Sequence, residues 1–372
     1  MTATHDDYLR TAYFGSLDGL RAIAVLGVIW QHVAGPHGGA LGRTGLGVSL
    51  FFVISGFLIT TLLLREHRST GSFSLRRFYI RRTLRIFPLY FAVLAVYVVL
   101  VALERHGSAA SEQFFDNLPA YATYTSNWFV QGVVAQNAIF YHAWSLATEE
   151  QFYVVWPALL LAVLALVRAP GRALALACAV VGTGALADQL ATHAITGSSF
   201  GLVVVRSIAT PICLGAILAA ILHHPAGYDR AGRLLGSRWA APLLALALVA
   251  TLQTLTTFWV ELCMALLVAA VCVREDHLLA PGLATGPLRL IGVVSYGVYL
   301  MHMLAANAVR PLLGHDFGID VFVGAAVVAV AMAYLSYRFF ETPILRLKAR
   351  FGGASTPPPP ARRLATAQPA RT

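Results

Sequence analysis

The sequence is poor in charge. Only 12% of its 372 residues are Asp, Glu, Lys or Arg, whereas a soluble globular protein has about a quarter. Hydrophobic residues make up 58%, and the mean hydropathy is +0.70. A soluble fold cannot hide this excess, because much of its surface has to remain polar. The proportions exclude a soluble domain and indicate a polytopic membrane protein.

Lysine and cysteine are also scarce. Lys348 is the single lysine among 27 basic residues, so the formal charge of +10 comes from arginine. Nearly all arginines fall between apolar runs or in the tails, which is typical of membrane topology and of phosphate sites rather than of nucleic-acid binding. The cysteines lie inside apolar runs without metal-ligand spacing, which indicates packed thiols, no disulfides and no metal site. They are Cys178, Cys213, Cys263 and Cys272.

Ten apolar stretches are long enough to predict helices that cross a bilayer, which takes about 20 mostly apolar residues. The predicted fold class is therefore all-α: a polytopic integral-membrane bundle of about ten transmembrane helices in the cell membrane. No cleaved signal is expected, because the first run leads into a loop without a small-residue cleavage site. The predicted spans are 17–34, 46–64, 86–103, 151–167, 173–192, 201–222, 239–255, 258–273, 289–305 and 319–339.

The distribution of arginine predicts the orientation. If the N-terminus is cytoplasmic and the spans alternate, the predicted loop 65–85 with its seven arginines is cytoplasmic, as the positive-inside rule requires. Most later arginines fall on the same side, so both termini are predicted to be cytoplasmic. The predicted domains are a transmembrane domain at 1–348 and a disordered Pro/Ala/Arg-rich cytoplasmic tail at 349–372.

The first predicted span carries ionisable side chains, which are costly in hydrocarbon and mark a functional site by default. Arg21 and His32 are about 16 Å apart along a helix axis and close to the same face. That face can hold an anion at its inner end and an imidazole deeper in. Two simpler explanations stay open: Asp18 pairs with Arg21 one turn away, and His32 is an interfacial histidine bonded to the backbone.

A second basic element lies just before the third predicted span. Arg82 and Arg85 are one turn apart and can converge on one polyanion, since guanidinium forks match phosphate geometry. Most of the neighbouring arginines are explained by topology alone. The pair favours a soluble anionic ligand that approaches from the cytoplasm.

A third element, His142-Ala-Trp-Ser-Leu-Ala-Thr-Glu149-Glu150, precedes the fourth predicted span. Residues 145–148 can cap that helix, and one carboxylate would favour its dipole. Two adjacent carboxylates, expected on the same side as His32, also suit orienting a histidine or binding a polar acceptor.

Six stretches, in order along the chain, carry a joint signal. They are SLDGLRAIAVLGVIWQH (16–32), FFVISGFLIT (51–60), RRTLRIFPLYF (81–91), HAWSLATEEQFYVVWP (142–157), SYGVYLMH (295–302) and SYRFFETP (336–343). Together they resemble the membrane acyltransferase-3 family, which includes bacterial O-antigen and exopolysaccharide O-acetyltransferases and macrolide O-acyltransferases. One departure is Ala147-Thr148, where Ser-Val is common in the family.

The resemblance implies an enzyme that moves an acyl group, commonly acetyl, from acyl-coenzyme A to a hydroxyl of a carbohydrate or macrolide-like acceptor. Acyl-coenzyme A is then a co-substrate; no permanently bound cofactor, metal or nucleic-acid partner is expected. The implied catalytic residues are His32, Glu149 and Glu150, and the implied acyl-coenzyme A ligands are Arg21, Arg82 and Arg85. Supporting positions are Asp18, Trp144, Ser145, Tyr296, His302 and Glu341.

The mechanism expected from both arguments places coenzyme A phosphates at the arginines and the thioester near His32. His32 then acts as general base on the acceptor hydroxyl, oriented by Glu149 or Glu150. The alternative is a proton-coupled transporter with His32, Glu149, His302 and Glu341 as a relay. The acceptor, its side of entry, the acyl chain length, an acyl-histidine intermediate, the oligomeric state and the roles of Arg206 and Glu261 stay open.

Overall fold

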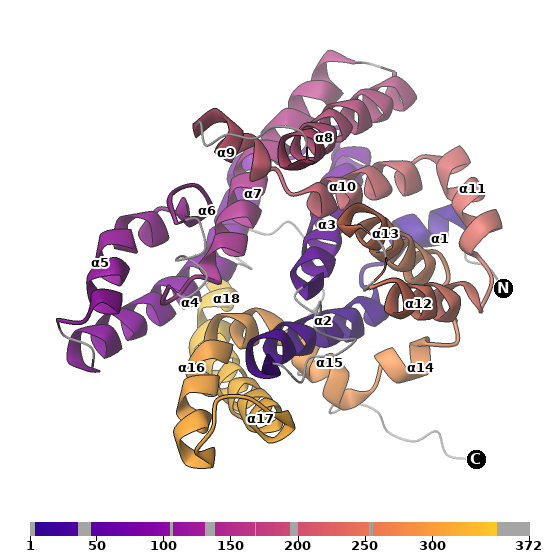
Figure 1. The fold of residues 1–372 in the computed structure, drawn as a ribbon. Coiled ribbons are helices and arrows are strands. Elements are labelled where there is room, and N and C mark those ends of the chain that lie inside the picture. Colours follow the sequence, from indigo (N-terminus) through magenta and orange to yellow (C-terminus); the bar gives the residue numbers. More distant parts are fainter. Residues whose placement is uncertain are drawn as a thin grey trace.

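The computed structural model describes residues 4–35, 46–104, 107–130, 138–167, 169–193, 200–252, 254 and 256–347 (Figure 1). Within these ranges all regular structure is helical, which confirms the predicted all-α class. The helices are α1 His5–Arg10, α2 Gly15–Val33, α3 Gly47–Thr70, α4 Leu75–Glu104, α5 Ala109–Ala122, α6 Ser126–Phe129, α7 Ala143–Leu166, α8 Pro170–His193, α9 Phe200–Arg206, α10 Thr210–His223, α11 Pro225–Leu235, α12 Ala240–Thr251, α13 Thr257–Val273, α14 Ala280–Leu283, α15 Gly286–Val293, α16 Ser295–Leu313, α17 Ile319–Ser336, the π-helix η4 Tyr337–Glu341 and α18 Thr342–Leu347.

Several helices are long and apolar enough to cross a bilayer. Five qualify singly: α3, α4, α7, α8 and the continuous run from α17 to α18. Two bent pairs also qualify, α10 with α11 at 106° and α15 with α16 at 83°. The chain is therefore a multi-pass membrane protein. The number of ten spans and the cytoplasmic location of the termini stay predictions.

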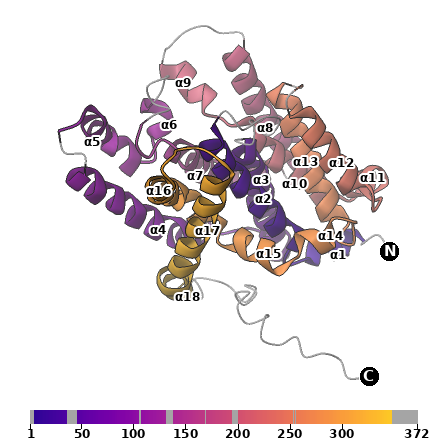
Figure 2. The same ribbon diagram turned by 60° about the horizontal axis from the view of Figure 1, so that its bottom comes forward.

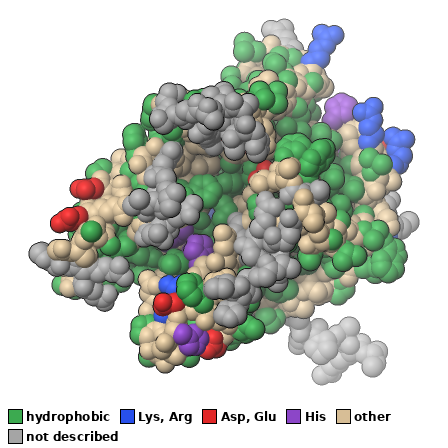
Figure 3. All heavy atoms as spheres, viewed as in Figure 1, with side chains coloured by type: hydrophobic (Ala, Val, Ile, Leu, Met, Phe, Trp, Pro, Cys, Tyr) green, Lys and Arg blue, Asp and Glu red, His purple; other side chains and the backbone are tan. Residues whose placement is uncertain are grey.

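The outer faces of these helices are apolar. Leu103 and Leu166 are 77% and 82% exposed, and hydrophobic side chains dominate the face in Figure 3, where the few charged groups lie mostly toward its edges. Exposed leucines on this scale would be unfavourable in water and are favourable against lipid chains. This surface is that of a membrane domain.

The helices gather around α2 and α3. In both ribbon views these two lie near the middle, with α4, α5 and α6 on one side and α11, α12 and α13 on the other (Figures 1 and 2). Helix α3 crosses α10 at very short range: a Cβ on Gly56 would collide with the carbonyl oxygen of Ile212, and one on Gly215 with that of Val53. Small residues allow such crossings, which maximise packing where no hydrophobic effect joins helices.

Three predicted spans differ from the structure. The predicted span 201–222 is divided into α9, which ends at Arg206, and α10, which begins at Thr210 next to Pro211, a residue that suits a helix start but not a helix interior. Helix α4 begins at Leu75 rather than residue 86, so five arginines of the predicted loop lie on α4 and the other two on α3; Arg81 of α4 pairs with Glu66 of α3 at 3.3 Å. Helix α7 begins at Ala143 rather than residue 151. Residues 145–148 are therefore not its cap, and the Ser145 hydroxyl instead donates to the His142 carbonyl. Hydropathy locates the apolar centre of a span, whereas arginine and glutamate extend helices beyond it.

The N-terminal helix is held against the arginine-rich end of α3. Arg65 donates hydrogen bonds to the carbonyls of Tyr8 and Thr11, and Arg68 pairs with Asp6 at 3.3 Å. The N-terminal segment therefore lies on the same side as the turn between α3 and α4 and the arginines of the adjoining helix ends, as the topology argument requires. The predicted tail, 349–372, lies outside the described residues.

The glycine crossing generates a first prediction. Gly56→Val should lower the free energy of unfolding by about 1–3 kcal/mol, because the backbone of α10 has to move away. The matched control is Gly232→Ala in α11, where an added Cβ meets nothing within 4 Å. The measurement is the temperature at which detergent-solubilised protein loses its monodisperse peak on size exclusion. A Gly56 variant as heat-resistant as the Gly232 variant contradicts the close crossing.

Candidate functional site

A cavity of about 280 Å³ lies in the bundle between α2, α3, α4, α7 and α16. One wall is apolar and comes largely from α3, while the rest carries charged and hydroxyl groups. The cavity brings together seven of the twelve predicted site residues, which are Arg21, Arg82, Arg85, Ser145, Glu149, Glu150 and Tyr296.

The Glu149 carboxylate is the best-connected group in the wall. Its Oε1 atom accepts hydrogen bonds from the hydroxyls of Ser55 and Tyr153. The Arg82 guanidinium lies 4.0 Å from the same oxygen and stacks 3.8 Å above the Tyr153 ring. The Arg82 Nε atom is buried and has no hydrogen-bond partner among the residues that the structure describes. Arg82 is thus held in position while part of its donor capacity stays unused.

Two more guanidinium groups reach the same cavity. Arg21 pairs with Asp18 at 3.5 Å, and the buried Asp18 carboxylate also accepts a hydrogen bond from Tyr13. Arg85 lines the wall one turn beyond Arg82 and forms no ion pair within 4 Å among the described residues. The simple pairing proposed for Asp18 and Arg21 is therefore real. The wall thus contains the unpaired guanidinium of Arg85 and the incompletely bonded guanidinium of Arg82, a combination that favours an anionic ligand.

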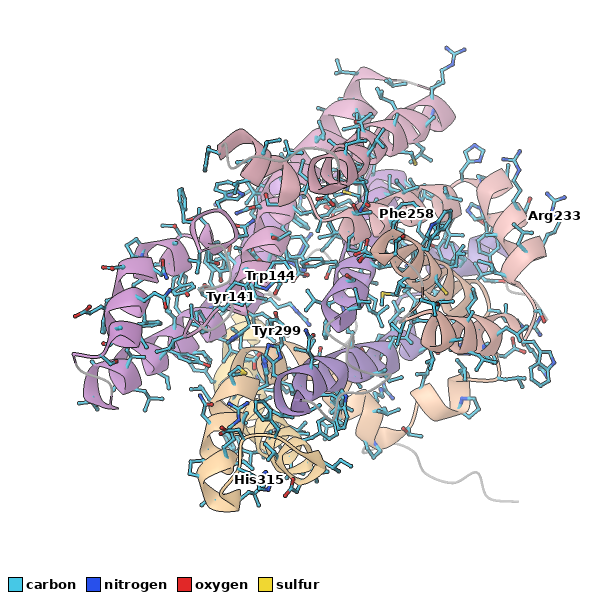
Figure 4. All side chains as sticks on the ribbon, viewed as in Figure 1. Tyr141, Trp144, Arg233, Phe258, Tyr299 and His315 are labelled. Carbon is cyan, nitrogen blue, oxygen red and sulfur yellow. The ribbon has the colours of Figure 1, made fainter. Side chains whose placement is uncertain are left out.

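The far end of the cavity is closed by two hydroxyls. Those of Tyr299 and Ser145 lie 2.6 Å apart, and both lie within hydrogen-bond distance of the His142 carbonyl, at 3.0 and 3.1 Å. Figure 4 shows Tyr299 and Trp144 near the centre of the molecule, far from Arg233 at its rim. Tyr299 lines the cavity and also contacts side chains that lie outside the cavity lining.

Behind Tyr299 lie three imidazoles, contributed by α2, the start of α7, and α16. The ring centres of His32 and His302 are 5.0 Å apart, as are those of His302 and His142. Tyr299 lies 5.7 Å from the His302 ring and 5.8 Å from the His142 ring. We call these three residues the histidine cluster; none of them lines the cavity.

Each imidazole of the histidine cluster is bonded to a backbone carbonyl. The pairs are His32 Nδ1 with Val28 O at 2.8 Å, His302 Nδ1 with Tyr299 O at 2.5 Å and His142 Nε2 with Leu300 O at 3.3 Å. A carbonyl only accepts, so these three nitrogens carry the protons of the neutral rings. The other nitrogen of each ring then holds a lone pair. For His32 this is Nε2, which is the atom a general base needs.

The predicted contact between a carboxylate and His32 is not formed. Glu149 is held by Ser55, Tyr153 and Arg82, and no contact in the described part of the chain joins Glu149 or Glu150 to His32. Because α7 begins at Ala143, both carboxylates lie about 10 Å along its axis from His142. They belong to the arginine end of the site.

The remaining predicted residues support the walls. Trp144 packs edge-on against Phe52 of the cavity, and the Tyr296 hydroxyl donates to the Ile86 carbonyl at 3.0 Å, which ties α16 to α4. Glu341 ends the π-helix η4 and accepts from Ser336 at 3.3 Å. It is outside the cavity lining.

Sequence analysis missed four contributors to the site: Ser55, His142, Tyr153 and Tyr299. All four lie within the stretches that resemble the family, so their positions in those motifs could have indicated them. Of the two polar residues whose roles were left open, Glu261 does not line the cavity. Glu261 accepts a hydrogen bond from Ser49 at 2.9 Å, whereas the Arg206 side chain lies outside the described residues.

Fold and site together define a multi-pass membrane protein with a cationic central cavity beside a buried histidine cluster. A family model described as an acyltransferase domain matches residues 14–338. The chain belongs to the acyltransferase-3 family.

Similar curated proteins support this family assignment. The chain is 30% identical over 357 residues to the O-acetyltransferase OatA of Staphylococcus aureus, covering 89% of this chain and 57% of that protein. It is also 30% identical over 370 residues to the peptidoglycan O-acetyltransferase OatA of Listeria monocytogenes, covering 89% and 56%. The chain thus spans little more than half the length of these relatives. No solved structure matches it.

The Glu149 connections generate a second prediction. Arg82→Met leaves a largely buried carboxylate without its cation and should lower the free energy of unfolding by about 1–3 kcal/mol. Adding Glu149→Leu should recover most of that loss, because no unpaired charge then remains. Heat unfolding of the two single variants and the double variant in one detergent measures the coupling. Strictly additive losses contradict an interaction between the two side chains.

Proposed function

We propose that the protein is an integral-membrane O-acyltransferase that moves an acyl group, acetyl in the first instance, from acyl-coenzyme A to a hydroxyl of a cell-surface glycan. The observation that carries the proposal is the cavity with Arg82 and Arg85 in its wall and the histidine cluster directly behind its Tyr299 end. Membership of the acyltransferase-3 family supports the reaction class. The Listeria relative is a peptidoglycan O-acetyltransferase by name, which supports peptidoglycan as the first acceptor to test.

The donor fits the cavity by charge and by length. Phosphate groups match the guanidinium forks of Arg82 and Arg85, and the apolar α3 wall suits the less polar arm of coenzyme A. Helix α2 is continuous from Gly15 to Val33, so Arg21 and His32 are about 16 Å apart along its axis. A pantetheine arm is about as long, and places the thioester near the Tyr299–Ser145 end.

In this proposal His32 is the general base. Its Nε2 lone pair removes the proton of the acceptor hydroxyl, and the acceptor oxygen attacks the thioester carbonyl carbon. The carbon–sulfur bond breaks, coenzyme A leaves as the thiolate and then takes up the proton. In this proposal Glu149 positions Arg82 and does not orient His32. Burial of the reacting groups limits hydrolysis of the thioester.

The transporter alternative gains no support. It requires His32, Glu149, His302 and Glu341 to act as one relay. In the described structure His32 and His302 are neighbours, but Glu149 is bonded to Ser55 and Tyr153, and Glu341 to Ser336. The two carboxylates have local partners that do not include the imidazoles.

The third prediction concerns His32. Membranes carrying the wild type should transfer label from radiolabelled acetyl-coenzyme A to a hydroxyl of the acceptor, with peptidoglycan fragments, other glycans and a macrolide compared in parallel. His32→Ala should lower the rate by about 100-fold or more, the usual contribution of a general base. A wild type that neither binds nor consumes acyl-coenzyme A overturns the proposed function. An active His32→Ala variant overturns only the assignment of the base.

The fourth prediction separates donor binding from chemistry. Arg82→Gln should raise the KM for acetyl-coenzyme A about tenfold, because charge-assisted hydrogen bonds to phosphate are lost. The matched control is Arg76→Gln, which removes an exposed arginine of the same helix that does not line the cavity. Steady-state rates over a range of donor concentrations measure both. Equal KM values for the two variants contradict a phosphate site at Arg82.

A further inference from the structure

The histidine cluster holds two more imidazoles than a single general base requires. We propose that His32, His142 and His302 act as one proton-holding unit, in which His302, supported by His142, takes over the proton that His32 removes from the acceptor. This inference rests on the proposed function. It assigns a role to His142, which sequence analysis did not select, and a specific role to His302.

The first observation is the placement of the lone pairs. Three separate elements bring the rings together at centre-to-centre distances of 5.0 Å. In every ring one nitrogen donates to a helix carbonyl, which leaves His32 Nε2, His302 Nε2 and His142 Nδ1 as acceptors in the neutral state. In the neutral state these three nitrogens can only accept hydrogen bonds, so none can bond to another. One added proton would turn one of them into a donor.

The second observation is an unsatisfied buried nitrogen. His302 is 0% exposed, and its Nε2 atom has no hydrogen-bond partner within the described residues. A buried acceptor without a partner costs about 1–3 kcal/mol, so such atoms in well-packed positions call for an explanation. When His32 carries the extra proton, its Nε2–H becomes a donor for His302 Nε2. The cluster is thus better satisfied in the charged state, which is the kind of interaction that favours a reaction rather than binding.

Within the part of the chain that the structure describes, no carboxylate forms a hydrogen bond or ion pair with a ring of the cluster, in which one nitrogen of each ring bonds to a backbone carbonyl. The groups that face it are the Arg310 guanidinium, which donates to the His32 carbonyl at 3.0 Å, and the hydroxyl-bearing rings of Tyr97 and Tyr299 beside His142. No group of three His, Cys, Asp or Glu in the described chain is arranged to hold a metal ion. A second imidazole therefore takes the place that a carboxylate has in a catalytic triad.

The proton balance of the step is complete. The acceptor O–H bond breaks and its proton goes to His32 Nε2, while the acceptor oxygen forms a bond to the thioester carbon and the carbon–sulfur bond breaks. His302 Nε2 then receives the proton from His32. The proton finally passes to the coenzyme A thiolate at the Tyr299–Ser145 end of the cavity, which gives the free thiol and neutral imidazoles.

The fifth prediction tests His302 by a substitution that preserves its structural hydrogen bond. In His302→Asn the side-chain amide nitrogen takes the position of Nδ1 and can still donate to the Tyr299 carbonyl, but no acceptor remains at the position of Nε2. We expect kcat for acetyl transfer to fall about 10- to 100-fold, with the KM for acetyl-coenzyme A unchanged. The acid limb of the pH–rate profile should move to lower pH, because the protonated His32 loses an acceptor that stabilises it.

The matched control is Tyr97→Phe. It removes a buried hydroxyl that has no hydrogen-bond partner among the described residues and lies beside the His142 ring, and it leaves the packing in place. Its kcat and pH profile should equal those of the wild type. His142→Gln should change the profile in the same direction as His302→Asn but by less, since His142 lies further from His32. If the His302 variant does not fold, the His142→Gln variant tests the proposal in its place.

Rescue separates a proton acceptor from a structural residue. Added imidazole should restore part of the activity of His302→Ala, because a free ring can enter the space and accept the proton. An active wild type whose His302→Asn and His142→Gln variants keep wild-type kcat and pH profile overturns the proton-holding unit and leaves the proposed function standing. A wild type without acyl transfer is the separate result that removes the proposed function itself.

Discussion

The structure depends on the way one carboxylate is held in a largely apolar interior. A charge such as that of Glu149 is tolerated only when it is paired and hydrogen-bonded. Ser55 of α3, Arg82 of α4 and Tyr153 of its own helix α7 meet that need. Three helices are thereby joined at one point, and an arginine is fixed in the wall of the cavity. The glycine crossing of α3 and α10 places α3 close enough for this to occur.

A second constraint is the separation of like charges. A guanidinium beside an imidazole would disfavour its protonated form. The arginines that line the cavity are separate from the histidine cluster, with Tyr299 and Ser145 between them. Arg310 comes closer, because its guanidinium donates to the His32 carbonyl. The proposed function uses the separation: a polyanion binds at the cavity arginines, and a proton is accepted at the cluster. The length of a helix, rather than a special residue, provides this separation.

Much of the fold could be predicted from the sequence, and the errors concern where helices begin and where they break. Hydropathy detects apolar centres well, so the core of each long span was found where the structure has a helix. It does not detect helix ends that leave the apolar layer, and α4 and α7 begin eleven and eight residues earlier than expected. The second error mattered for the site, because the position of Glu149 relative to His142 follows from where α7 starts.

The sequence by itself determined the membrane class, the family and most of the residues at the site, because run length, arginine distribution and motif spacing are local properties. Only the tertiary structure decided which of these residues act together. It assigned Glu149 to Arg82 rather than to His32, and it joined His142 to His32 and His302 from three distant segments. The reason is physical: partners across a bundle are set by where helices start and cross, which no single segment specifies.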